Sequence, residues 1–155
     1  MISSFGAVSH TESKVLSDVA MNTVEETGAL LSKIPGGEAF VAFLGADEDF
    51  GDAEIVGIRL ERERGSELTL DLPWKSCRVV FSFDEWVDVQ LLSFSRQNVI
   101  GALHLRRAPE REAGFAEIGV GYIPAEIEFA FDPCVGAHGT VSGRVTGIRV
   151  EPYEN

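Results

Sequence analysis

An alternation of apolar and polar residues with a period of two is the feature that most constrains this fold. Residues 67–72 read Glu-Leu-Thr-Leu-Asp-Leu, and because successive side chains of a strand point to opposite faces, the three leucines share one face. The same period runs through most segments from residue 39 onward. It predicts a β-rich body over about residues 39–152, with one buried and one solvated face to each strand.

Helical periodicity is confined to about residues 11–34. Apolar residues recur there at every third or fourth position, Thr11 or Ser13 can serve as the N-cap, and Pro35 followed by two glycines ends the pattern. We therefore expect one N-terminal helix that packs on the sheet.

Turn residues divide the β-rich body into eight or nine short strands. Residues 64–66, Arg-Gly-Ser, predict a hairpin between a strand near residues 56–61 and the strand at 67–72, and a long turn is expected at 132–139. This spacing predicts an α+β fold that is mainly antiparallel β, arranged as a sandwich or a partly closed barrel.

The alternation also predicts which side chains face inward on the later strands. The inward-facing rows are Cys77-Val79-Phe81-Phe83, Val87-Val89-Leu91 and Val99-Gly101-Leu103-Leu105. Later strands are expected over 115–122, 127–131 and 140–150.

Length and charge limit the class of protein. The 155 residues fit a single domain over residues 1–155, and the formal net charge of −12, from 25 acidic and 13 basic residues, repels nucleic acid and attracts cationic partners. There is no apolar run of about 20 residues that could span a membrane. Two cysteines and no recognisable secretory signal favour a cytoplasmic location.

The sequence assembles no credible catalytic, metal or cofactor site. The acidic run at residues 47–52 departs from the calcium-loop pattern, with Asp52 and Ile58 where that pattern has glycine and glutamate. The three histidines are widely separated, and His104, opposite Leu103 on its strand, can border a binding surface. We therefore predict no enzyme activity, no metal and no cofactor.

Trp74 and Trp86 lie at predicted strand ends beside polar residues. Each can be an exposed interface anchor, or it can cap the core while its indole nitrogen reaches a polar edge. Solvent exposure separates these two interpretations.

Three ordered segments resemble the immunity protein 50 family, which is encoded beside bacterial polymorphic toxins. The first is Phe50-Gly51-Asp52-Ala53-Glu54-Ile55 followed by residues 58–62, the second is residues 87–103, and the third comprises residues 139–143 and 148–152. Gly51 stands where the family pattern usually has a histidine, so no role of that imidazole is transferred. The motif positions are Phe50, Asp52, Ala53, Phe94, Gln97, Asn98, Gly139, Glu151 and Pro152.

The resemblance implies a protein that binds a cognate toxin domain and occludes it without catalysis. On the residues themselves, Asp52 can cap a turn and Asn98 can satisfy backbone groups at a corner, so the motif is interpreted as structural. Exposed side chains elsewhere then become the candidate toxin contacts. These are Asp47, Glu48, Asp49, Asp84, Glu85, Trp86 and Asp88.

Two other classes of function remain open from the sequence. A small-ligand-binding barrel or a remote enzyme would enclose polar groups such as Arg96, Gln97 and His104 in a concave face. A homodimer or larger homo-oligomer would instead pair a sheet face or edge with a second copy.

Overall fold

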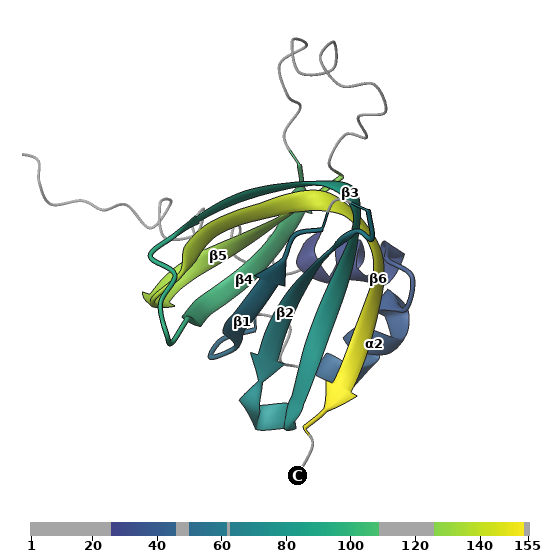
Figure 1. Cartoon of the computed structure of the whole chain (residues 1–155). Coiled ribbons are helices and arrows are strands. Elements are labelled where there is room, and N and C mark those ends of the chain that lie inside the picture. Colours follow the sequence, from purple (N-terminus) through teal and green to yellow (C-terminus); the bar gives the residue numbers. More distant parts are fainter. Residues whose placement is uncertain (1–25, 46–49, 62, 109–125, 154–155) are drawn as a thin grey trace, which may run out of the picture.

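The computed structural model describes residues 26–45, 50–61, 63–108 and 126–153, apart from the side chains of Glu85 and Trp86. Six strands of the described residues form a closed antiparallel barrel in the order β1-β2-β3-β6-β5-β4 (Figure 1). Their bounds are β1 (Glu54–Arg59), β2 (Ser66–Leu72), β3 (Cys77–Leu92), β4 (Val99–Arg107), β5 (Ile127–Val135) and β6 (His138–Pro152). The predicted α+β, mainly antiparallel class is therefore correct, but the barrel is closed, whereas a sandwich or a partly closed barrel was predicted.

The two longest strands hold the barrel together. β3 and β6 pair from Cys77 opposite Pro152 to Leu92 opposite His138, with irregular pairing between Ser82 and Val87. β2 lies on the other side of β3 over its first half, and β5 lies on the other side of β6 over its first half. Both long strands arch over the molecule in Figure 1 and so belong to both walls of the barrel.

The inward faces follow the alternation of the sequence. The leucines of β2 and the row from Cys77 to Phe83 are buried, as predicted, and the β1–β2 hairpin also forms. At the centre, the Phe81 and Phe129 ring centroids are 5.0 Å apart and meet edge to face. Aromatic packing of this kind adds specific geometry to the burial of apolar surface.

Two helices cover the end of the barrel where β6 ends. Residues 26–33 are helical, a turn follows, and α2 (Gly37–Leu44) packs against β6. The Phe40 ring lies 6.0 Å from Phe50 and 6.1 Å from Phe81, centroid to centroid, so this side chain fills the barrel interior. No helix of the described residues is long and apolar enough to cross a membrane.

The helix at residues 26–33 also supplies a hydrogen-bond acceptor to the backbone of β4. The buried Thr27 hydroxyl accepts a hydrogen bond of 3.0 Å from the backbone N–H of Leu105 on β4. β1 and β4 pair in register only at Glu54 and Val99, so none of the described strands pairs with β4 on that side at Leu105. A side chain of the helix thus takes the place of a backbone acceptor.

Several predictions of element boundaries were wrong. Residues 39–44 belong to α2, not to a strand, because Gly37, Phe40 and Leu44 bury one face at helical spacing. The predicted helix ends correctly before Pro35, but its part from residue 11 to 25 lies outside the described residues.

The strands are also fewer and longer than predicted. Six strands occur in the described part of the chain, where eight or nine short ones were expected, and the strand predicted at 115–122 lies outside that part. β3 has 16 residues because residues 84–86 form an irregularity in the β3–β6 pairing and no turn interrupts the strand. The long turn predicted at 132–139 shrinks to residues 136 and 137, with β5 and β6 continuing on either side.

One predicted inward row has the wrong phase at its start. Ile100 is buried and Gly101 is exposed, whereas Leu103 and Leu105 face inward as predicted. The register of β4 against β5 shifts on both sides of Ile100. An irregularity of this type moves the following side chains to the other face.

Candidate functional site

The first two segments of the family-like pattern pair with each other and close the barrel. The backbone N–H of Ile55 donates to the carbonyl of Asn98 at 2.9 Å, and the N–H of Ile100 donates to the carbonyl of Ala53 at 2.9 Å. The N–H of Asp52 also reaches the carbonyl of Ile100 at 3.1 Å. These residues therefore form the seam between β1 and β4.

The buried side chain of Asn98 organises the turn that precedes this seam. Its Oδ1 accepts hydrogen bonds from the backbone N–H of Ser95 at 2.8 Å and of Ala137 at 3.0 Å, and its Nδ2 donates to the Ser95 carbonyl at 2.8 Å. One amide thus joins the β3–β4 turn to the β5–β6 turn. This corner role is the one that the structural interpretation of Asn98 predicts.

Gly136 lets the two turns approach closely. Its φ is +80°, and a Cβ at this position would lie 2.3 Å from the Gln97 carbonyl oxygen and 2.6 Å from Asn98 Oδ1. Any larger residue would be strained and would push the turns apart.

Exposed apolar side chains surround this junction. Leu92 is 64% exposed, Phe94 56% and Val135 46%. They come from the end of β3, the β3–β4 turn and the end of β5, and the exposed Arg96 and Gln97 lie in the same turn. We call these five residues the tip; it occupies the end of β3 that is opposite the helices (Figure 1).

Carboxylates flank the tip. Asp52 is exposed at the β1–β4 seam, and Glu54 Oε1 accepts the backbone N–H of Asn98 at 3.4 Å. Asp132, three residues before Val135, pairs with His104 at 2.9 Å between Oδ2 and Nε2. Arg96 is the cation within the tip, so negative charge predominates around this end of the barrel.

The opposite end carries a second group of exposed apolar residues. Phe43, Trp74, Val150 and Tyr153 are each between 38 and 41% exposed, and we call them the helical-end cluster. Lys75 Nζ donates to the Phe43 carbonyl at 2.8 Å and lies 5.0 Å from the centre of its ring. Partial burial raises the pKa of the Tyr153 phenol above its ordinary value.

Trp74 is 39% exposed, so its side chain lies at the surface of the helical end. The side chain of Trp86 lies outside the described residues.

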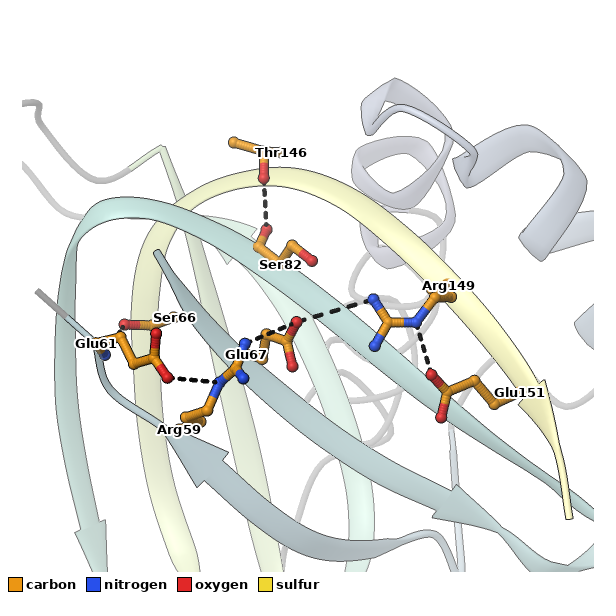
Figure 2. Close-up of polar contacts among 8 residues, drawn as sticks. All are labelled: Arg59, Glu61, Ser66, Glu67, Ser82, Thr146, Arg149 and Glu151. Atoms are coloured by element: carbon orange, nitrogen blue, oxygen red, sulfur yellow. Dashed lines mark hydrogen bonds and ion pairs between the residues drawn. The ribbon is translucent and has the colours of Figure 1, made fainter. Parts of the chain in front are cut away.

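Ion pairs cover the outer face of the strands between the two ends. Arg59 Nη2 lies 3.1 Å from Glu67 Oε1, and Arg149 bridges that same carboxylate at 3.8 Å and Glu151 at 2.7 Å (Figure 2). The hydrogen bond from Glu151 raises the pKa of Arg149 further above its ordinary value. Such exposed pairs link β1, β2 and β6 but each contributes little free energy.

A more buried ion pair lies on the outer face of β4, β5 and β6. Arg106 binds Glu128, whose other carboxylate oxygen accepts the Ser142 hydroxyl at 3.4 Å. Glu128 and Ser142 are both buried and directly opposite each other across β5 and β6. Each polar group of this set has a partner, which is the arrangement expected of a structural pair.

Of the predicted toxin-contacting residues, only Asp84 and Asp88 have described side chains, and neither lies at the tip. Asp84 and Asp88 are half-buried in the middle of β3, and the backbone of residues 85 and 86 lies between them at the irregularity in the β3–β6 pairing. Asp47, Glu48 and Asp49 fall outside the described residues, and of Glu85 and Trp86 only the backbone is described.

The remaining motif positions are dispersed. Phe50 and Ala53 are buried in the core, whereas Phe94 and Gln97 are exposed at the tip. Gly139 has φ +129°, and a Cβ there would lie 2.0 Å from the Gln90 carbonyl oxygen. Glu151 and Pro152 lie at the far end of β6.

Sequence reasoning missed Leu92 and Val135 as members of an exposed group. Leu92 lies two residues before the motif position Phe94, which is a signal that could have been used. Val135 had no such signal, because it falls within the long turn that the sequence predicts at residues 132–139, whereas β5 continues to Val135.

Comparison with protein-family models, curated proteins and solved structures finds no match. The resemblance to the immunity protein 50 family thus stands on the quoted segments alone. In the part of the chain that the structure describes, no three His, Cys, Asp or Glu side chains are grouped so as to hold a metal ion.

Proposed function

We propose that this chain is an immunity-type protein that binds a cognate bacterial toxin domain in the cytoplasm and neutralises it by occlusion. It changes no covalent bond in its partner. The observation that carries the proposal is the tip, where three exposed apolar side chains stand on a turn that is held by a buried amide. A preorganised apolar group loses little conformational entropy when a protein partner covers it.

The filled interior of the barrel supports a protein partner over a small ligand. Phe50, Phe81 and Phe129 are fully buried, and Phe40 closes the space beside them. A ligand-binding barrel encloses its ligand among inward-facing side chains. Here those side chains pack on one another, so recognition falls to the outer surface.

The toxin domain as partner is supported by the ordered resemblance and by charge. With a formal net charge of −12, the chain attracts a basic domain over a distance and thereby increases the rate of encounter. Inhibition then requires only that the bound chain cover the partner's working surface.

Growth rescue tests the proposal. The C-terminal domain encoded by the adjacent reading frame is expressed in a bacterial host with and without the full chain. We expect the domain alone to arrest growth, and co-expression to restore growth and yield a stoichiometric complex on purification. A toxic domain whose effect persists beside well-expressed chain, or an adjacent domain without toxicity, overturns the proposal.

A further inference from the structure

We infer that the tip is the surface that contacts the toxin domain, with Phe94 as the central anchor, and that the partner presents an apolar pocket with a basic rim. This inference rests on the proposed function and identifies the site through which it acts.

The geometry of the tip suits an anchor. Phe94 follows Leu92, the last residue of β3, by two positions, and Val135 ends β5, where two turns meet at the Asn98 amide. Phe94 is more than half exposed although its turn is hydrogen-bonded. Large aromatic side chains at the centre of an interface contribute most of the binding free energy, and flanking apolar residues exclude water around them.

Charge around the tip suits a basic partner. Asp52 is exposed at the seam beside the tip, Glu54 accepts the backbone N–H of Asn98, and Asp132 lies three residues before Val135. A basic partner is therefore attracted to this end of the barrel.

The same charges argue against a second copy as the occupant. A two-fold contact between two tips would place the carboxylates of one copy near those of the other. Like charges that face each other across an interface weaken association. A separate partner with basic residues around an apolar pocket satisfies both the apolar and the charged parts of the surface.

Binding measurements on the full chain and the adjacent toxic domain test the inference. We expect Phe94→Ala to weaken binding about thirtyfold and to reduce growth rescue, in keeping with the loss of a central anchor. Asp52→Asn keeps a residue that tolerates the local φ of +68°. It should slow association about twofold to threefold at low salt and have little effect at high salt.

Leu60→Ala is the matched control, because Leu60 is 60% exposed but follows the far end of β1. It should bind like the wild type, and the thermal unfolding midpoints of all three variants should stay close to the wild-type value. Wild-type rescue together with unchanged binding of Phe94→Ala overturns this inference and leaves the proposed function standing. Absence of wild-type rescue overturns both.

Light scattering measures the oligomeric state and so tests whether a second copy covers the tip. We expect a monomer for the wild type at the concentrations used for binding. A dimer that Phe94→Ala dissociates and Leu60→Ala leaves intact would show that a second copy covers the tip, and would overturn the assignment to a toxin domain.

Discussion

The two ends of the barrel are closed by different physical means. At the end that carries the tip, backbone hydrogen bonds between residues 53–55 and 98–100 form a seam, and the Asn98 amide holds two turns together. At the helical end, Phe40 fills the interior and Thr27 satisfies an open strand edge. Directional hydrogen bonds fix the conformation of a small exposed turn, whereas apolar burial supplies free energy without fixing a surface shape. The two ends should therefore respond differently to substitution.

Removing the apolar closure should have the largest effect on stability. Phe40→Ala empties space beside Phe50 and Phe81, so we expect the free energy of unfolding to fall by about 4 kcal/mol in urea denaturation. Phe43→Ala on the same helix is the control. That side chain is exposed, and its loss should cost less than about 1 kcal/mol. Similar losses for both variants would mean that α2 does not close the barrel through Phe40.

Removing the polar closure should cost somewhat less but should change the tip. Asn98→Ala leaves the N–H groups of Ser95 and Ala137 without their acceptor, and we expect a loss of about 3 kcal/mol. Exchange of the Ala137 amide hydrogen should become faster in NMR. The exposed neighbour variant Gln97→Ala should change stability by no more than about 0.5 kcal/mol. Equal, small effects of the two substitutions would contradict the role given to the Asn98 amide.

A smaller effect is expected at the strand edge that the first helix covers. Thr27→Val keeps the shape of the side chain but removes the acceptor of the Leu105 N–H, and should cost about 1.5 kcal/mol. Faster amide exchange at Leu105 with unchanged exchange at Ala137 would show that the defect stays at the helical end. Ser32→Ala, which removes a hydrogen bond within the helix itself, is the control and should leave Leu105 protected.

The outer ion pairs should matter least. Arg149→Ala removes contacts with Glu67 and Glu151, in both of which the Arg149 side chain is 52% exposed. We expect a loss of at most about 1 kcal/mol that diminishes as salt is added. A loss larger than that of Thr27→Val would contradict the small contribution assigned to these ion pairs.

Much of the local structure could be predicted from particular residues. The leucines of β2 and the row from Cys77 to Phe83 revealed their buried face, and His104 lies opposite Leu103 as predicted. The helix end before Pro35 was also correct. In each case the signal and the structure lie within a few residues of each other.

The candidate site was less predictable. The sequence pointed to the segments at residues 50–55 and 95–100, but not to their pairing across 44 positions. Phe94 and Gln97 were interpreted as structural, and their exposure became visible only when the ends of three strands were placed together. Asp84 and Asp88, two of the predicted contacts, lie in the middle of β3.

By itself, the sequence determined which side chains of β2 and of the first half of β3 point inward, where the first hairpin turns, and that one asparagine sits at a polar corner. These follow from the geometry of adjacent residues and from local hydrogen bonding. Tertiary structure alone decided that β3 continues through residues 84–86, that residues 37–44 form a helix, and that the tip gathers Leu92, Phe94 and Val135. Those outcomes depend on partner strands and on the space left inside a closed barrel, which no short stretch of sequence encodes.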